Sequence, residues 1–176
     1  IEQLQFNNII AIDDKEACAN IELRFNHPCK ELVWVAQDCS ATEPFDFAHS
    51  HMGGCGGAED WDSVKTAKLQ LNGHDRFRER EGTYFRTVQM YQHHTGGHRQ
   101  NKTSADGFIY VYSFALKPEE HQPSGTCNFS RIDNAVLQLG LNVSAEATAN
   151  KFVKVYATNY NVLRVMSGMG GLAYSN

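Results

Sequence analysis

Short stretches in which hydrophobic and polar residues alternate recur along the chain. In the segment 67–71, the residues Ala67, Leu69 and Leu71 are separated by polar ones, and the segment 152–158 shows the same period of two. Successive side chains of a β-strand point to opposite faces of the sheet, so such segments bury one face and expose the other. The pattern predicts antiparallel sheets that pack against each other as a sandwich.

Eight segments are predicted as strands, because each is rich in β-branched and aromatic residues and is bounded by turn-forming residues. They are residues 4–12, 21–25, 31–36, 67–71, 108–116, 135–141, 152–158 and 162–166. No long helical period lies between them. We therefore predict an all-β fold, an eight-stranded antiparallel jelly-roll sandwich or a related two-sheet barrel, formed as a single domain by residues 1–176.

Three of the predicted connections, residues 39–66, 72–107 and 117–134, are far longer than hairpin turns. Loops beyond roughly 15 residues are uncommon and are usually functional or disordered. These loops carry several aromatic residues, which disordered segments lack. Within the second loop, residues 83–91 are expected to form one or two helical turns with Thr83 as the N-cap. We predict that the sandwich is a scaffold and that the long inter-strand loops contact a partner.

The glycine-rich tail is expected to behave differently from a flexible linker. Residues 168–171 contain three glycines and are followed by Leu172 and Tyr174. Glycine permits close approach of two backbones, so we expect the chain to return to the packed interior at this point.

Composition and charge argue against several classes of protein. The 16 Lys and Arg residues against 20 Asp and Glu give a net charge of −4, which argues against direct binding of nucleic acid along this surface. No apolar run approaches the roughly 20 residues of a transmembrane segment, and no signal-peptide pattern is present. Because the chain begins with Ile1, we expect a fragment or a processed product. The five cysteines are odd in number and irregularly spaced, which favours reduced thiols in a cytosolic compartment over a disulfide framework.

The strongest candidate for a metal site is the pair His49 and His51, with Cys55 and Glu59 further along the chain. Two histidines two positions apart share one face of a strand, as in the jelly-roll metalloenzymes of the cupin type. The second cupin motif is incomplete, because Asn128 stands where a histidine is required. A loop pair that hydrogen-bonds or faces solvent is favoured, and a cupin-like metal-binding jelly-roll enzyme is kept as the alternative.

A second histidine group, His93, His94 and His98, surrounds a Gly-Gly pair. No acidic residue lies nearby in the sequence to orient the rings, so a polar loop at a surface or interface is favoured over a metal site. The chain contains no nucleophile elbow and no phosphate-binding glycine loop. We therefore predict no catalytic residues, no bound metal and no cofactor.

Three glycosylation sequons begin at Asn101, Asn128 and Asn142. They matter only in a secreted protein, which the cysteines do not favour. A secreted lectin-like jelly roll is therefore a third interpretation.

The segment 75–81 interleaves charges of both signs among aromatic residues. It is either a solvated, ion-paired loop or a contact in which complementary charge sets the register with another protein. The aromatic and arginine residues nearby favour the second interpretation. A structural ion pair is expected between Arg131 and Asp133. The candidate subunit-interface residues are Arg76, Phe77, Arg80, Tyr84, Phe85, His93, His94, Phe129 and Arg131.

Long blocks in the second half of the chain carry a family resemblance. They are LQLNGHDRF at 69–77 with REGTYF at 80–85, YSFALKPEEHQPSGTCNFSRIDN at 112–134, and YATNYNVLR at 156–164 with GMGGLAYSN at 168–176. These blocks resemble major capsid proteins of nucleocytoplasmic large DNA viruses. The match covers most of the chain from Ala67 onward, whereas the residues before Ala67 match less distinctively.

The resemblance implies a double jelly-roll polypeptide, of which this chain is the carboxyl-terminal roll. It further implies homotrimers that form pseudo-hexagonal capsomers of an icosahedral shell, assembled in the host cytoplasm. The implied partners are other copies of the chain, the missing amino-terminal jelly roll and minor capsid proteins. We expect this roll to be poorly soluble alone, because a face made for the partner roll would be exposed.

Overall fold

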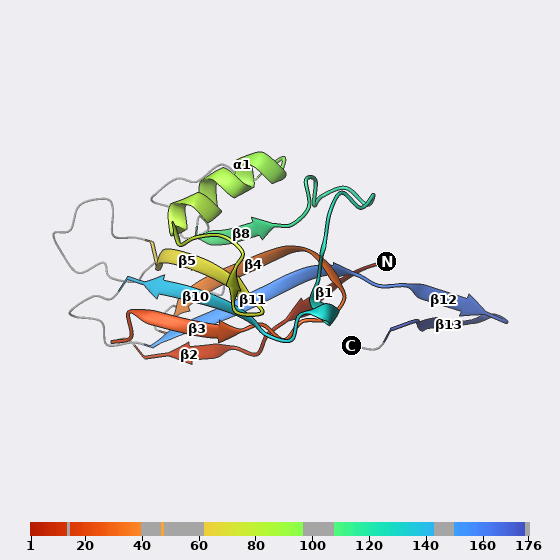
Figure 1. Ribbon diagram of the computed structural model, residues 1–176, viewed down its shortest axis with the longest axis horizontal. Coiled ribbons are helices and arrows are strands. Elements are labelled where there is room, and N and C mark those ends of the chain that lie inside the picture. Colours follow the sequence, from red (N-terminus) through yellow and green to blue (C-terminus); the bar gives the residue numbers. More distant parts are fainter. Residues whose placement is uncertain (14, 40–46, 48–61, 97–107, 143–149, 175–176) are drawn as a thin grey trace.

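The computed structural model describes residues 1–13, 15–39, 47, 62–96, 108–142 and 150–174. They form two antiparallel sheets that face each other and one separate hairpin (Figure 1). The predicted all-β sandwich is confirmed, although its strands are more numerous and more unequal in length than the eight expected.

The first sheet, called sheet A here, has the strand order β1-β11-β4-β8. Two short strands extend it, since β2 pairs with β11 and β9 pairs with β4. Its strands are β1 (Glu2–Phe6), β2 (Ile10–Ile12), β4 (Pro28–Asp38), β8 (Ile109–Ser113), β9 (Cys127–Asn128) and β11 (Lys151–Tyr160).

The second sheet, called sheet B, has the order β3-β10-β5-β6, and β7 also pairs with β5. Its strands are β3 (Cys18–Glu22), β5 (Val64–Leu71), β6 (His74–Asp75), β7 (Arg80–Glu81) and β10 (Ala135–Leu141). The turn from β5 to β6 uses Asn72 and Gly73, both with positive φ. This is the residue pair that two-residue hairpin turns favour.

The core lies between the two sheets and follows the predicted alternation. Every second residue of β10 and β11 is buried, including Leu137, Leu139, Val153 and Val155. In sheet B, Leu137 stands opposite both Ile21 of β3 and Leu69 of β5. Each fully buried side chain of this size stabilises the fold by about 1.5–3 kcal/mol.

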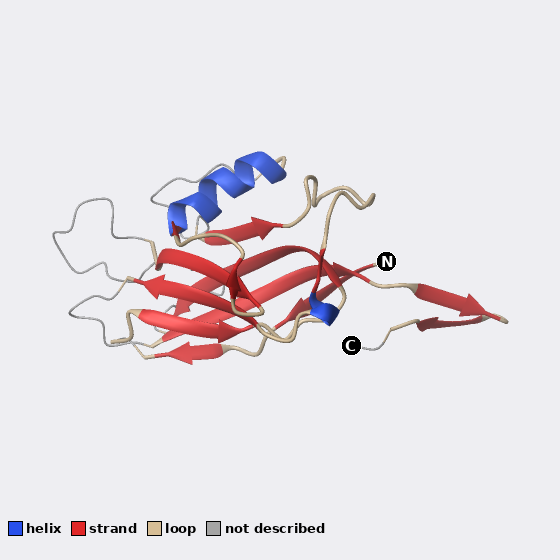
Figure 2. Ribbon diagram, viewed as in Figure 1, coloured by secondary structure: helices blue, strands red, loops and turns tan. Residues whose placement is uncertain are grey.

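A helix closes the sandwich along strand β8 (Figure 2). It consists of a π-helical part, η1 (Tyr84–Val88), which continues into α1 (Gln89–His93). The predicted helical turns at 83–91 are confirmed, but the predicted N-cap is wrong. Thr83 is itself in the α conformation and makes no side-chain cap, and its carbonyl accepts a hydrogen bond from Thr87.

The entry to this helix requires a glycine. A Cβ atom on Gly82 would lie 2.1 Å from the backbone oxygen of Val64, so any side chain would displace backbone. The close approach places Phe85 in the core, where its ring centroid is 5.2 Å from that of Trp34.

A buried polar network ties the helix to the strands. Arg86 donates to the carboxylate of Asp62 over 2.8 Å, and the hydroxyl of Tyr110 donates to the same carboxylate. The backbone N–H of Val64 in turn donates to the Tyr110 hydroxyl over 3.2 Å. Burial raises the pKa of Tyr110 well above its usual value, so the hydroxyl stays protonated and donates.

Two strand predictions at the start of the chain are corrected. The predicted strand 4–12 is split into β1 and β2, whose registers on β11 differ by one residue. A one-residue slip reverses which face each side chain occupies, so Leu4 and Phe6 are exposed while Ile12 is buried. The predicted strand 21–25 is displaced to β3, because pairing with β10 ends at Glu22 although the alternating burial continues to Phe25.

The tail forms the separate hairpin of β12 (Leu163–Met166) and β13 (Met169–Leu172). Its turn residues Ser167 and Gly168 both have positive φ. The hairpin extends along the longest axis, away from the sandwich (Figure 1). The expected close approach at the tail glycines is wrong: Gly171 has open space around it, and Leu172 is exposed.

Candidate assembly surface

The predicted interface residues on the β7 and helix side lie together at the edge of the sandwich. The guanidinium carbon of Arg80 is 4.5 Å from the ring centroid of Tyr84, close enough for a cation–π contact. The Tyr84 hydroxyl accepts a hydrogen bond from Gln89 over 2.9 Å. The half-buried Phe77 ring lies 4.7 Å from the ring of Tyr112. Internal contacts therefore hold this part of the surface in a fixed shape.

Two of the nine candidates are core residues instead. Phe85 is fully buried, and Phe129 is 2% exposed with its ring edge-on to Phe25 and Phe114 at 6.0 Å. Both belong to segments expected to be loops that reach a partner. Their aromatic side chains pack into the core of the sandwich.

The histidines at the end of α1 join the helix to sheet A. Nδ1 of His93 lies 3.0 Å from the carbonyl oxygen of Leu116. Nε2 of His94 lies 3.0 Å from a carboxylate oxygen of Glu31, and its Nδ1 lies 3.2 Å from Glu119. The expected lack of acidic partners is wrong, because these carboxylates come from β4 and from the loop after β8. His98 lies outside the described residues.

The two carboxylates favour the charged form of His94. Glu31 raises the pKa of His94, and Glu119 adds to the effect, while partial burial opposes it. A protonated imidazole can donate from both nitrogens at once, which suits a ring between two acids. Hydrogen bonds from Thr95, with a smaller effect of His94, lower the pKa of Glu119.

The remaining arginine candidates are exposed. Arg76 lies in the surface between β6 and β7, and its charge partly offsets the rise that burial causes in the pKa of Tyr112. The predicted ion pair of Arg131 with Asp133 is absent among the residues that the structure describes. The Asp133 backbone N–H instead donates to Asn72 over 2.9 Å.

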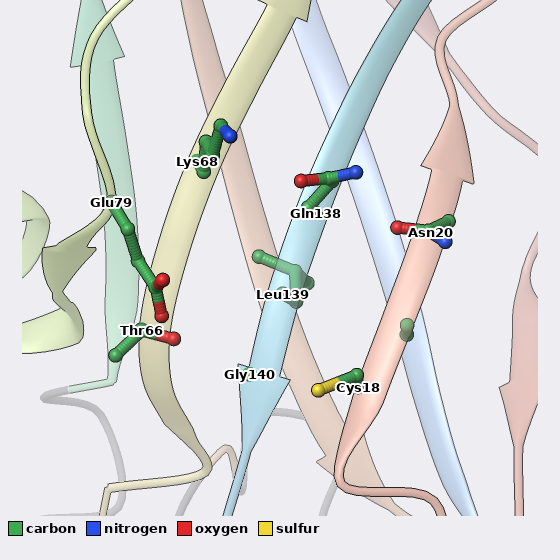
Figure 3. Close-up of a pocket in the computed structure, with 9 residues that line it drawn as sticks. Cys18, Asn20, Thr66, Lys68, Glu79, Gln138, Leu139 and Gly140 are labelled. Atoms are coloured by element: carbon green, nitrogen blue, oxygen red, sulfur yellow. The ribbon is translucent and has the colours of Figure 1, made fainter. Parts of the chain in front are cut away.

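A shallow groove of about 170 Å³ crosses the outer face of sheet B (Figure 3). Polar side chains of β3, β5 and β10, with Glu79 beside them, form most of its lining. The groove opens at Gly140, where a Cβ atom would lie 2.4 Å from the hydroxyl oxygen of Thr66. The lining combines one lysine, Lys68, with one glutamate, so its formal charges cancel.

Among the described residues, the cysteines, acidic residues and histidines form no reactive cluster. Cys29 stands opposite Cys127 in the pairing of β4 with β9, and burial raises the pKa of both thiols, which disfavours the reactive thiolate. Within the described ranges, no cluster of three potential metal ligands occurs. The candidate metal residues His49, His51, Cys55 and Glu59 lie outside the described residues.

The asparagines of the two described sequons make hydrogen bonds to the backbone. The side chain of Asn128 accepts a hydrogen bond from the backbone of Ser130, at the start of the 3₁₀ turn η3 (Phe129–Arg131). The side chain of Asn142 donates to the carbonyl of Asp62 over 2.6 Å. Asn101 lies outside the described residues. No helix in the described part of the chain is long and apolar enough to cross a membrane.

Sequence reasoning missed the most apolar exposed surface. Large hydrophobic side chains are exposed at the start of the chain, at Leu4 and Phe6, and throughout the hairpin of β12 and β13. The alternation of these segments predicts strands but does not show whether a second layer covers them. The pair Ser167-Gly168 could have been recognised as a two-residue turn, which would have predicted a second strand pairing with residues 163–166.

Comparison with known protein families gives a match over nearly the whole chain. The family model described as large eukaryotic DNA virus major capsid protein matches residues 1–171. The chain is 49% identical over 192 aligned residues to the major capsid protein of Pyramimonas orientalis virus, which covers all of this chain and 42% of that relative. It is 41% identical to the major capsid protein of Paramecium bursaria Chlorella virus 1, covering all of this chain and 48% of the relative.

Solved structures agree with the sequence comparison. The capsid structure of PBCV-1 matches with a TM-score of 0.74 and 37% identity, over 99% of this chain and 51% of that chain. The Faustovirus major capsid protein matches at 10% identity with a TM-score of 0.59, which shows a shared fold alone. The chain thus spans about half the length of the curated relatives that it matches from end to end.

Proposed function

We propose a structural role in a virus shell, on the premise that the chain belongs to the major capsid protein family of large eukaryotic DNA viruses. The observation that carries the proposal is the family match over residues 1–171, joined to the fold match with a capsid protein at 37% identity. The relatives are structural proteins of virions. The chain is accordingly a building block and not an enzyme.

The protein acts as one roll of a double jelly-roll capsid subunit. The sandwich matches about half of the PBCV-1 capsid chain, so a second roll of similar size accounts for the rest of a full-length subunit. The missing amino-terminal roll is then the first partner of this one. The exposed Leu4 and Phe6, on the outer face of sheet A, support the expectation that this roll is poorly soluble when it is alone.

Full-length subunits assemble with themselves. Three copies contribute six rolls to a pseudo-hexagonal capsomer, and capsomers tile an icosahedral shell in the virion after assembly in the host cytoplasm. Closed shells arise from repeated identical contacts, and each contact can be weak because many act together. The exposed Arg76, Arg80 and Arg131 are proposed lateral contacts, with minor capsid proteins as further partners and without direct contact to nucleic acid.

The chemistry of the described surface supports this role. The polar networks described above join one secondary structure element to another, and the buried thiols are held in their unreactive form. These arrangements fix the shape of a scaffold. The cupin-like and lectin-like alternatives gain no support from the relatives named above, which are capsid proteins.

Native mass spectrometry of the full-length protein tests the proposal. The expected species is a complex of three identical chains, in equilibrium with larger assemblies at higher protein concentration. A protein that stays monomeric at every concentration and ionic strength would contradict the proposed function.

A further inference from the structure

The loop that joins β8 to β9 is fixed at its neck and passes the end of helix α1 (Figure 1). On one side of the neck, the backbone N–H of Phe114 donates to the carbonyl of Lys30 over 2.9 Å. On the other side, the hydroxyl of Ser124 accepts a hydrogen bond from the backbone N–H of Lys117 over 2.9 Å. The neck therefore separates a tip, residues 118–123, from the body of the sandwich.

The tip is fastened to the end of α1 through Glu119. Its carboxylate accepts from the backbone N–H of Thr95 over 3.1 Å and from the Thr95 hydroxyl over 2.7 Å. The same carboxylate lies 3.2 Å from Nδ1 of His94. Pro118 is buried, whereas residues 119–123 are exposed. Glu119 is thus an anchor at the start of an exposed stretch of chain.

His94 connects this anchor to sheet A. Its Nε2 lies 3.0 Å from one carboxylate oxygen of Glu31 on β4, and the other oxygen of Glu31 accepts from the hydroxyl of Thr158 over 3.3 Å. The Nε2 atom and the oxygen that faces it are both buried, and within the described part of the chain neither makes a well-aligned hydrogen bond. Attraction between opposite charges therefore holds this contact, which requires a protonated ring.

Neighbouring titratable side chains on α1, β4, β8 and the loop face other partners. These pairs are His93 with the carbonyl of Leu116, Lys30 with Glu2, His121 with Glu2, Lys117 with Glu120, Tyr110 with Asp62, and Tyr112 with the ring of Phe77. The contact of His93 needs one N–H group, which a neutral imidazole also has. The carboxylates that act on His94 are those of Glu31 and Glu119.

We propose that His94 is a pH-operated latch for the tip of this loop. The protonated ring holds both carboxylates at once, whereas a neutral ring has a single N–H and turns a lone pair toward one of them. The side chain of Glu31 is 12% exposed and that of Glu119 is 40% exposed. Because the buried carboxylate loses more when it is left without a donor, the neutral ring keeps Glu31 and loosens the tip.

The direction of the switch follows from the two acids. They raise the pKa of His94 above its ordinary value of 6.5, so the latch is closed below pH 6.5 and opens as the pH rises through the folded pKa. The inference concerns the folded chain itself and does not depend on how copies of the chain assemble.

Hydrogen–deuterium exchange of the full-length protein between pH 5.5 and pH 9 tests the latch. Exchange times are scaled to the intrinsic rate at each pH, so that only changes in protection are compared. We expect the protection of amides in residues 119–124 to fall about fivefold with a midpoint above pH 6.5, the size expected for a partly exposed ion pair. Protection of the core strand at residues 135–141 should stay constant over the same range.

Three variants assign the change to the junction. His94→Gln keeps an amide that can hydrogen-bond but removes the titrating ring, so the pH dependence should disappear. Glu119→Gln keeps an oxygen that accepts from Thr95 but removes one of the two acids, so the midpoint should move to lower pH. The matched control Glu120→Gln changes the next residue, which pairs with Lys117, and should leave the midpoint unchanged.

The remaining outcomes overturn the inference and leave the proposed function intact. They are protection of the tip that does not depend on pH, a pH dependence that persists in His94→Gln, and equal midpoints in the two glutamate variants. If His94→Gln does not fold, the two glutamate variants decide between the outcomes. A merely structural role of Glu119 would lower the protection of the tip at every pH without moving the midpoint.

Discussion

Strands β11 and β12 follow each other in the chain and are built from similar residues, yet their environments are opposite. In β11 every second side chain is buried, and Val153 and Val155 have no exposed surface. In β12 all four residues are exposed, including Leu163 and Val165. The difference is the second sheet, which covers β11 and is missing at β12. Alternation of hydrophobic residues therefore identifies a strand, while burial depends on what packs against it.

The comparison separates a body that is stabilised by its own core from the exposed hairpin of β12 and β13, called the arm here. Hydrophobic burial supplies most of the stability of the body, since it is the dominant favourable contribution to folding. Substitutions in the body should change the free energy of unfolding, and matched substitutions in the arm should change it little. Three matched pairs of variants test this division.

Removing a buried charge from the body should have the largest effect. Arg86→Met removes the charged partner of the part-buried Asp62 carboxylate, which keeps its hydrogen bond from Tyr110, and is expected to cost about 3 kcal/mol of unfolding free energy. The exposed Arg164 of the arm is the matched position, and Arg164→Met should change stability by less than about 0.5 kcal/mol. Urea denaturation of the unassembled protein, followed by the fluorescence of the buried Trp34, measures both. A similar loss in the two variants would remove the distinction.

Truncating a leucine should give the next largest difference. Leu137→Ala removes a core side chain that is 1% exposed and should cost about 2–5 kcal/mol. Leu163→Ala removes the same atoms from an arm side chain that is 52% exposed, and should cost less than about 1 kcal/mol. The same denaturation experiment applies. A loss above 2 kcal/mol for Leu163→Ala would show that the arm is part of the folded body.

Adding one methyl group to a glycine should destabilise the body but not the arm. Gly82→Ala forces a Cβ atom against the backbone of Val64 and should destabilise the body by about 1–3 kcal/mol. Gly171→Ala meets open space, and should leave stability unchanged or raise it by up to about 1 kcal/mol, because alanine restricts the unfolded chain. Thermal unfolding followed by circular dichroism distinguishes the two. Destabilisation by Gly171→Ala would contradict the open environment.

The smallest effect concerns pH and the link between α1 and sheet A. Because the folded pKa of His94 is raised above its ordinary value of 6.5, its stabilisation is complete below pH 6.5 and is lost as the pH rises through the folded pKa. His94→Gln should therefore cost about 1 kcal/mol at pH 5.5 and less at pH 9. The control His121→Gln alters a ring that is 95% exposed and should have little effect at either pH. A larger cost of His94→Gln at pH 9 would reverse the sign and exclude the charged pair.

The central strands could be predicted from sequence because their burial is purely periodic. The bounds of β10 agree with the predicted 135–141, and β11 extends the predicted 152–158 by a few residues. The split of the first strand was missed, although the alternation breaks at Asn7 and Asn8, and the slip itself is visible only in the pairing with β11. The pair Asn72-Gly73 favours a two-residue hairpin turn, so this turn could have been predicted from sequence. The segment that contains it was instead predicted to be a loop.

The candidate surface was harder to predict than the fold. An aromatic residue outside a predicted strand can belong to an interface or to the core, and the sequence does not distinguish the two. The structure shows that Phe85 and Phe129 are buried in the core. The acidic partners of His94 are 63 and 25 residues away in the chain, so only the folded structure brings them together. The exposed arm became visible as a surface only once the strand after β12 was known to pair with it.

The most direct test of the whole account is a cryo-electron microscopy reconstruction of the shell formed by the full-length protein. The account predicts that the sandwich of sheets A and B repeats as a structural element of the shell. A shell in which this sandwich is absent would contradict it.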